Sequence, residues 1–421
     1  MIQAFIDRHF YHLYLITLFF GIILYGLIGF QSIDEICGGV LFIFFIFYMF
    51  QTKDWEINKF FLTVLGIFTF YLAYSLQIHT TSPKGVAMDF IIQLKPYLAF
   101  FCVYQLMPRF TDSQKLILRQ SSVVCWALLV PLGIAGLVNP KILDVTMAHA
   151  SNYAAAITAL ALVFLYTSEN TLKNRILFII MLAVGLASGR SKFYGFFIFA
   201  SFATLYFNNI KRLKINFKTI FLFLILTGII IFVAKEKIEL YFLQGLSPDA
   251  EKDFVARFVL YATSFQIFQD YFPFGTGFGS FATFASGAYY SPIYAQYEID
   301  GIWGISKSYH SFISDTYYPS LAQFGIVGVV LFILFWVYLL KKVFSYLKVT
   351  SDTQLSNIVL LLVVFFAIEN IADATFTSNR GFYFMMFMGI VYAEMKRRTY
   401  TALEKKETAP IVSSSTQTLH N

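Results

Sequence analysis

The sequence predicts an all-α protein that crosses a membrane many times, and three observations predict it. Of the 421 residues, 58% are hydrophobic and only 13% are charged, whereas soluble domains carry about 25% charged residues. Apolar runs long enough to cross a bilayer as helices recur along the whole chain. Lipid offers no partners for backbone N–H and C=O groups, so each run must form a helix. We therefore expect a polytopic integral membrane protein.

One large polar segment, residues 236–319, interrupts the series of apolar runs. We expect about 12 transmembrane helices, of which nine lie within residues 1–235 and three within residues 320–395. The polar, Ser- and Thr-rich residues 396–421 are typical of a disordered tail. The expected helices are residues 11–30, 34–50, 59–77, 88–107, 121–139, 152–167, 175–189, 192–208, 217–235, 320–340, 357–371 and 380–395.

The distribution of positive charge predicts the orientation of the helices. If both termini are cytoplasmic, 20 of the 31 Lys and Arg residues lie on the cytoplasmic side and 5 lie in the short outer loops. Cytoplasmic loops of membrane proteins are enriched in Lys and Arg. We therefore expect cytoplasmic termini, a cytoplasmic tail and an outer large loop. The net charge of +7 then indicates no nucleic-acid partner.

The cysteines and the acidic residues do not have the spacing of a metal site. Cys37, Cys102 and Cys125 all lie within apolar runs, so we expect buried thiols there. The large loop contains no cysteine, so we expect no disulfide framework and no bound metal.

Three cations lie where they could contact an anion. Lys95 lies inside the expected helix 88–107, where a charge costs roughly 2.5–3.5 kcal/mol. It therefore either faces the helix bundle and contacts an anionic head group, or reaches back to the interface. Arg190 and Lys192 lie in a tight outer turn. Guanidinium binds phosphate oxygens as a fork, so this pair suits a lipid diphosphate, although it also suits an interfacial anchor.

A fourth cation, Arg257, lies in residues 253–271, which have the apolar periodicity of an amphipathic helix. Such a helix can lie on the outer membrane surface with Arg257 near lipid phosphates. The alternative is an intrahelical pair between Arg257 and Asp253. The apolar stripe consists of Phe254, Phe258, Tyr261 and Phe265.

The stretch from Pro273 to Phe281 contains three glycines at alternate positions. It lacks the lysine and the Ser or Thr of a phosphate-binding P-loop. We therefore predict a tight turn that brings its backbone close to a neighbouring segment.

His310 is the only histidine of the large loop. A neutral imidazole can take a proton from a sugar hydroxyl that attacks an anomeric carbon, although residue type alone favours a structural histidine. Aromatic side chains near it could stack on sugar rings. They are Tyr289, Tyr290, Tyr294, Tyr297, Trp303 and Tyr309.

The order of these motifs resembles the O-antigen ligase/polymerase superfamily of bacterial cell envelopes. The resemblance covers roughly residues 185–340 and rests on the order of the motifs rather than on any single one. The arginine turn reads Gly-Arg-Ser instead of Ser-Arg-Gly. His310 precedes Gly325 by about four residues more than in the family, which is about one helical turn. The matching residues are Gly189-Arg190-Ser191, Arg257, Pro273–Phe281, His310-Ser311 and Gly325-Ile326-Val327-Gly328.

The resemblance implies a metal-independent glycosyltransferase that needs no nucleotide or other cofactor. Its donor would be a polyprenyl-diphosphate-linked oligosaccharide at the periplasmic face of the bacterial inner membrane. Arg190 and Arg257 would hold the diphosphate and stabilise its charge as it leaves. Lys192 and Lys95 would add phosphate contacts. His310 would position or deprotonate the acceptor hydroxyl.

Several functions remain open at this stage. The favoured one is an O-antigen, capsule or exopolysaccharide polymerase, which acts among membrane lipids with a chain-length regulator or a flippase as a partner. A ligase that joins the glycan to a lipid A core uses the same donor and differs in its acceptor. A transporter or flippase without catalysis would also accommodate Lys95 inside a helix.

Overall fold

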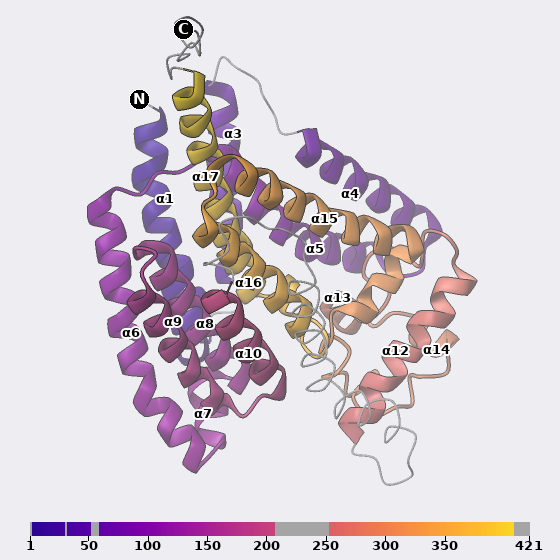
Figure 1. Ribbon diagram of the computed structural model, residues 1–421. Helices are drawn as coiled ribbons and strands as arrows, with labels where there is room; N and C mark the ends of the chain where they lie inside the picture. Colours follow the sequence, from indigo (N-terminus) through magenta and orange to yellow (C-terminus); the bar gives the residue numbers. More distant parts are fainter. Residues whose placement is uncertain (1, 30–31, 52–58, 207–251, 408–421) are drawn as a thin grey trace, which may run out of the picture.

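The computed structural model describes residues 2–29, 32–51, 59–206 and 252–407, which form a bundle of helices (Figure 1). These residues contain no β-strand beyond a single bridge between Ser306 and Tyr309. The predicted all-α class is therefore confirmed. Six of the described helical segments are long and apolar enough to cross a membrane, so the protein is membrane-embedded. They are Ile33–Gln51 (α3), Lys59–Ile78 (α4), Pro83–Leu106 (α5), Asp112–Val138 (α6), Ala150–Thr167 (α8) and Tyr318–Thr350.

The last of these segments combines the 3-10 turn η5, Tyr318–Phe324, with helix α15, Gly325–Thr350. A shorter apolar helix, α16, follows at Thr353–Glu369. The remaining elements are α1 (Ile2–Leu18), the π-turn η1 (Phe19–Ile23), α2 (Tyr25–Ile28), α7 (Lys141–Met147), α9 (Leu172–Ala183), the 3-10 turn η2 (Val184–Ser188), α10 (Ser191–Tyr206), α12 (Lys252–Asp270), α13 (Phe284–Ala288), α14 (Ile293–Gln296), the 3-10 turn η6 (Thr375–Thr377) and α17 (Asn379–Glu407).

Several expected helix boundaries differ from the observed ones. The first helix begins at Ile2 and is interrupted by a π-turn inside the expected span 11–30. The expected span 175–189 divides into a helix of 12 residues and a 3-10 turn, so neither part crosses a bilayer alone. The expected helix 217–235 lies outside the described residues, as does the beginning of the large loop.

The predicted disordered tail begins too early. Residues 396–407 continue α17 as helix, because their arginines bind partners on neighbouring segments. Arg398 donates to Asp352 at 2.5 Å, and Arg397 donates to the carbonyl of Pro108 at 3.1 Å. Gln3 also donates to the carbonyl of Leu106, at 3.2 Å. The end of α17 and the start of α1 therefore lie at the same end of the bundle (Figure 1).

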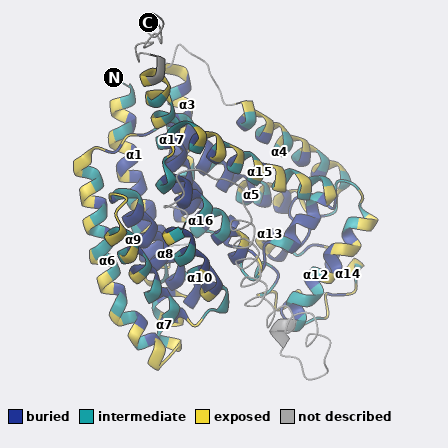
Figure 2. Cartoon of the chain, in the orientation of Figure 1, coloured by how far each residue is buried: buried dark blue, intermediate teal, exposed yellow. Residues whose placement is uncertain are grey.

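Helices α5, α8 and α17 form the centre of the bundle, and α4 and α6 cover it (Figure 2). In the span of α8, 89% of the residues are buried, against 22% in α4 and in α6. Lipid is as apolar as the core, so a helix exposed to lipid keeps large hydrophobic side chains on its outer face. The exposed residues of α4 and α6 include Leu62, Phe70, Leu128 and Leu137, as this rule requires.

Helix α12 confirms the predicted helix of the large loop, but its packing face differs from the predicted stripe. Ala256, Leu260 and Ile267 are fully buried and pack against a small separate core of the loop. Phe265 of the stripe is 62% exposed. Phe265 therefore points away from this core, whereas the buried face of α12 packs against the core of the loop and lies close to η5.

The glycine-rich stretch is the tight turn that the sequence predicts. Gly275, Gly277 and Gly279 have φ values of 75°, 78° and 69°, which lie in the left-handed region that favours glycine. A Cβ atom on Gly279 would lie 2.6 Å from the carbonyl oxygen of Gly85 in α5. A Cβ atom on Gly275 would lie 2.3 Å from the amide nitrogen of Gly325. Only glycine permits both the conformation and the close approach.

Hydrogen bonds fix this turn to the membrane helices. The backbone N–H of Gly279 donates to Asp89 of α5 at 2.8 Å. The N–H of Phe278 donates to Ser75 of α4, also at 2.8 Å. Tyr74 donates from its hydroxyl to the carbonyl of Gly275 at 2.9 Å. The buried Asp89 thus has a structural partner, and the large loop is held against the ends of α4 and α5.

We predict that Gly279→Ala destabilises the protein. The substitution imposes a left-handed alanine and a contact with the Gly85 carbonyl, so the expected loss is about 2 kcal/mol or more. The unfolding midpoint of the purified protein in detergent measures it. Gly301→Ala is the matched control, because a Cβ atom there meets nothing within 4 Å. Equal midpoints for the two variants would show that the turn does not depend on close packing.

Candidate functional site

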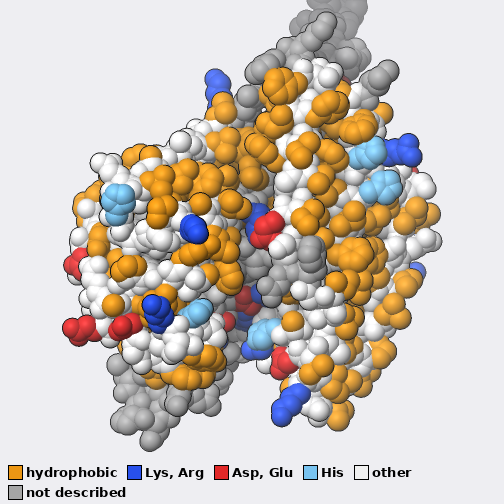
Figure 3. Space-filling model, turned by 180° about the vertical axis from the view of Figure 1, so that it is seen from behind, with side chains coloured by type: hydrophobic (Ala, Val, Ile, Leu, Met, Phe, Trp, Pro, Cys, Tyr) orange, Lys and Arg blue, Asp and Glu red, His pale blue; other side chains and the backbone are white. Residues whose placement is uncertain are grey.

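Charged residues from five segments that lie far apart in the sequence meet at one end of the bundle. Charges of both signs gather in a hollow that divides one face of the molecule (Figure 3). This end is opposite to the start of α1 and the end of α17 (Figure 1). The residues are His149 before α8, Arg190 and Lys192 at the start of α10, Asp315 before η5, Glu369 at the end of α16 and Asp373 after it, and Arg380 in the first turn of α17.

Asp373 is the centre of a buried set of ion pairs. Its carboxylate lies 2.6 Å from the Arg380 guanidinium and 3.3 Å from the Lys192 ammonium. Lys192 also lies 2.6 Å from Glu369. Burial by itself would raise the pKa of Asp373, but Arg380 and Lys192 lower that pKa well below its ordinary value. The four charges hold α10, α16 and α17 together.

Arg190 has a different kind of partner. Its Nη2 atom lies 2.6 Å from Nε2 of His149. His149 is the N-cap of α8 and remains open to solvent. Partial burial of its ring, together with the charge of Arg190, lowers the pKa of His149 to about 4. The ring is therefore neutral at pH 7 and adds no second positive charge beside Arg190.

Arg257 pairs with Asp315, which precedes η5. The Nε and Nη2 atoms of Arg257 both donate to Oδ2 of Asp315, the first at 2.5 Å. Burial raises the pKa of Asp315, and Arg257 only partly offsets this effect. Asp373 and Lys192 are close enough for their charges to act on the same carboxylate. Asp315 therefore links Arg257 to the ion pairs around Asp373.

An aromatic surface lies beside Arg257. The guanidinium carbon of Arg257 lies 5.5 Å from the centre of the Phe312 ring. The Trp303 ring lies 5.3 Å from Phe312 and 4.9 Å from Tyr309. Trp303 and Tyr309 are 40% and 44% exposed. We call Trp303, Tyr309 and Phe312 the aromatic platform, because they present ring faces and edges next to a cation.

Lys95 is buried within the bundle, and its partners are carboxylates. Its ammonium contacts Asp34 and lies 2.9 Å from Glu35, both in the first turn of α3. The cost of placing a lysine in the membrane is thereby offset inside the protein. The structure supplies no open phosphate position at Lys95, so its role as a phosphate ligand stays a prediction.

His310 lies in the chain between Tyr309 and Phe312 of the aromatic platform. Its side chain is exposed, and its ring packs near Gly287 of α13, where a Cβ atom would lie 3.0 Å from Cδ2 of His310. Within the part of the chain that the structure describes, the His310 ring makes no hydrogen bond or ion pair. The predicted proton-accepting role of His310 therefore gains no support from its contacts.

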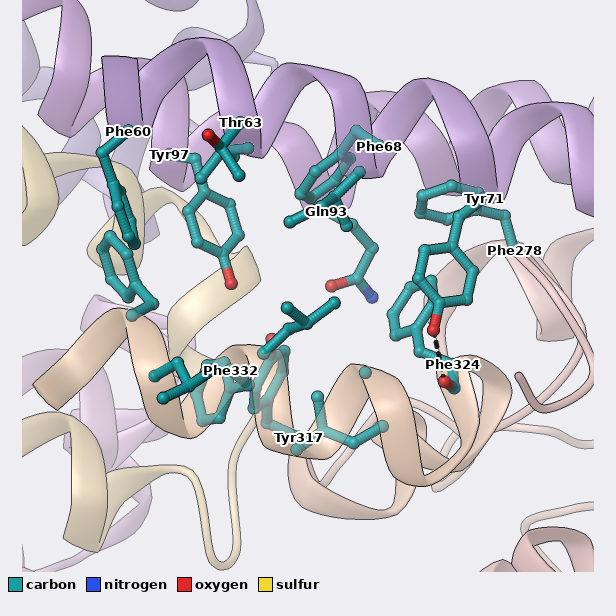
Figure 4. A pocket seen from close by; sticks show the side chains of 17 residues that line it. Phe60, Thr63, Phe68, Tyr71, Gln93, Tyr97, Phe278, Tyr317, Phe324 and Phe332 are labelled. Carbon is teal, nitrogen blue, oxygen red and sulfur yellow. Dashed lines mark hydrogen bonds between the residues drawn. The ribbon is translucent and has the colours of Figure 1, made fainter. Parts of the chain in front are cut away.

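An apolar cavity of about 230 Å³ lies between α4, α5 and α15 (Figure 4). Tyr97 and Gln93 point polar atoms into it, and aromatic rings close both ends. Tyr71 donates to the carbonyl of Phe324 at 2.7 Å and forms part of one end. Tyr317 also lines the cavity and follows Asp315 by two residues. The segment that carries Asp315 therefore also contributes to the wall of the cavity.

Comparison with protein-family models, with curated proteins and with solved structures finds no match to this chain. The likeness to the O-antigen ligase/polymerase superfamily therefore rests on the order of the motifs. The structure brings together Arg190, Lys192 and Arg257, whereas Lys95 pairs with Asp34 and Glu35 and His310 lies against Gly287.

Several site residues were not predicted from the sequence. His149, Asp315, Glu369 and Asp373 all lie at the ends of apolar runs, where polar residues are ordinary. In the predicted orientation all four residues lie on the outer side of the membrane, and this shared side is the sequence signal that relates them. That signal does not indicate which of them approach one another, because the helix order around the bundle is not encoded in the hydropathy.

We predict that Asp373→Asn destabilises the protein by roughly 3 kcal/mol at pH 7, because it leaves buried cations without their shared partner. The lowered pKa of Asp373 sets the pH dependence. Its contribution is fully present above the ordinary aspartate pKa of about 3.9 and is lost as the pH falls below that value. Unfolding midpoints of wild type and variant at pH 7 and pH 3.5 or so test both statements.

The exposed Asp300 provides the control. Asp300→Asn is expected to change stability by less than about 0.5 kcal/mol at either pH. An Asp373→Asn variant as stable as this control would mean that the ion pairs contribute nothing.

Proposed function

We propose that this protein is a membrane glycosyltransferase that moves a polyprenyl-diphosphate-linked oligosaccharide onto another glycan, as an O-antigen, capsule or exopolysaccharide polymerase. The site then faces the periplasm and lies in the bacterial inner membrane. One observation carries the proposal: Arg190, Lys192 and Arg257 meet at one end of a membrane-embedded bundle, beside an exposed aromatic platform.

The cations suit a diphosphate that carries a lipid chain. Arg190 is charged and faces a neutral histidine, so an anion gains a full favourable interaction there. The fork of Arg257 is held in place by Asp315, and a guanidinium fork matches the geometry of phosphate oxygens. Positive charge that is fixed before the reaction stabilises the diphosphate as it leaves.

The aromatic platform suits the sugars. Sugar rings have apolar faces that stack on aromatic side chains, and Tyr and Trp combine such a face with a polar edge. Trp303 and Tyr309 are exposed and lie next to Phe312, which contacts Arg257. A saccharide on the platform would place its reducing end near the diphosphate site. This arrangement supports an oligosaccharide substrate over a free phosphate.

The apolar cavity between α4, α5 and α15 suits part of the lipid chain. Its volume of about 230 Å³ is below that of a typical pocket for a whole ligand, which is about 300–1,000 Å³. It therefore fits a section of a prenyl chain whose remainder lies in the bilayer.

Transport without catalysis is the second candidate, and one observation favours it. Lys95 forms a buried ion cluster with Asp34 and Glu35 among membrane helices, as carriers of protons or ions often do. Transport without catalysis gives no role to the exposed aromatic platform. A ligase that attaches the glycan to a lipid A core remains within the proposed chemistry and differs only in the acceptor.

We predict that Arg257→Ala lowers glycan transfer at least about 100-fold while membrane insertion stays intact, because charge stabilisation of the leaving diphosphate is lost. Arg257→Lys is expected to restore little, since a point charge replaces a fork. Transfer from lipid-linked oligosaccharide in purified membranes is the measurement.

Lys307→Ala, an exposed cation of the same loop, is the charge-matched control and is expected to transfer normally. Normal surface polysaccharide in Arg257→Ala cells would overturn the assignment of Arg257.

A deletion strain separates the polymerase from the ligase. For the polymerase we expect loss of long surface glycans while single repeat units stay attached to their lipid acceptor. Gel electrophoresis of surface glycan, beside a complemented strain, measures chain length. Complete loss of attached glycan, with long chains accumulating on the polyprenyl carrier, would instead identify the ligase. Unchanged glycan would exclude both.

A further inference from the structure

We propose that His149, and not His310, is the residue that accepts the proton of the acceptor hydroxyl. This inference rests on the proposed glycosyl transfer and assigns a catalytic residue to it. The geometric reason is that His149 lies 2.6 Å from Arg190 among the clustered cations, whereas His310 lies against α13 without a polar partner in the described residues.

The contacts of His149 direct a lone pair into the hollow. The backbone N–H of Ser151 faces its Nδ1 at 3.3 Å, and the Arg190 guanidinium faces its Nε2 at 2.6 Å. Both neighbours are donors, but a neutral imidazole has one acceptor nitrogen. Nδ1 can accept from Ser151 only in the tautomer whose Nε2 carries the proton, whereas the contact with Arg190 requires the lone pair on Nε2; the shorter contact, to a charged donor, favours the second tautomer. The ring is thus held in the orientation that a proton acceptor needs.

Charged groups from three directions surround this ring. Arg190 precedes α10, Asp144 belongs to α7, and Asp373 and Arg380 lie between α16 and the start of α17. The two arginines lower the pKa of His149, and the two carboxylates raise it. Partial burial also lowers it, and the net value of about 4 keeps the imidazole neutral at pH 7. A diphosphate bound to Arg190 adds negative charge and raises the proton affinity of Nε2 at the moment of reaction.

Substrate binding frees the nitrogen that the step requires. When the diphosphate takes the guanidinium of Arg190, Nε2 of His149 loses its donor and becomes available to the acceptor hydroxyl. The hydroxyl oxygen then bonds to the anomeric carbon, and the bond from that carbon to the diphosphate oxygen breaks. The electron pair leaves with the polyprenyl diphosphate. The hydroxyl proton moves to Nε2, and the imidazolium later releases it to water.

The test compares three histidine-to-asparagine variants of the full-length protein in nanodiscs. Asparagine at position 149 keeps a side chain that caps α8, because asparagine is a favourable N-cap, but it cannot accept the proton. His310→Asn tests the competing candidate. His79→Asn is the control, because His79 is exposed between α4 and α5 with φ 53°, a conformation that asparagine tolerates. The probe is lipid-linked oligosaccharide extracted from the membranes of the host.

We expect His149→Asn to lower the transfer rate at saturating donor about 100-fold or more, with KM changed much less. We also expect 50 mM or so of imidazole to restore part of the rate of His149→Ala, since a free base replaces the missing one. His79→Asn is expected to match the wild type. A structural role alone would not give rescue by imidazole.

The outcomes separate the two proposals. A wild type that transfers no glycan overturns the glycosyltransferase proposal and the role of His149 with it. An active wild type and an equally active His149→Asn variant overturn the role of His149 alone. Loss of activity without rescue by imidazole also overturns the proton-accepting role. If transfer activity is instead lost in His310→Asn, and imidazole restores it in His310→Ala, the proton acceptor is His310.

Discussion

The close contact between the glycine turn and the membrane helices is the constraint on which the site depends. Backbone atoms of Gly275 and Gly279 lie against Gly325 and Gly85, at distances that no Cβ atom would allow. Because the turn directly follows α12, this contact fixes the helix that carries Arg257. The chain then returns through the aromatic platform to η5 and α15. Arg257 and the platform thus have a defined position relative to α4 and α5.

The balance of charge at this end of the bundle has a physical consequence for binding. Buried ion pairs lose hydration, and they persist only when their partners are complete. Asp373 completes the partners of Arg380 and Lys192, and those pairs hold helices together. Within the described residues, the Arg190 side chain makes its hydrogen bond to a neutral imidazole. An anion therefore disturbs the structural pairs least when it binds at Arg190.

The arrangement of polar and apolar surfaces is that expected for an amphipathic substrate. The apolar cavity lies among helices that cross the membrane, the cations lie at the helix ends, and the aromatic platform lies beyond them on the loop. A lipid, a diphosphate and a saccharide are joined in this same order in the proposed donor. Each part would meet a surface of matching polarity, so the position of the reacting carbon would be set from both sides.

The sequence by itself determined the fold class and the membrane embedding. It also singled out Arg190, Lys192 and Arg257 as cations at the outer membrane boundary. Hydropathy fixes these because lipid requires continuous apolar helices and tolerates charge only where it is paired or at the boundary. The alternate glycines of residues 273–281 also predicted a close-packed turn. Glycine permits a left-handed backbone and, because it has no Cβ atom, a close approach to a neighbouring segment.

The tertiary structure alone decided which polar residues meet. Asp373 reaches Lys192 and Arg380, and His149 reaches Arg190, across more than 40 residues of sequence in the latter case. The packing face of α12 was likewise decided by tertiary contacts, because Ala256, Leu260 and Ile267 are buried whereas Phe265 of the aromatic stripe is exposed. Hydropathy specifies that helices cross the membrane, but the order and rotation of the helices follow from side-chain packing between them.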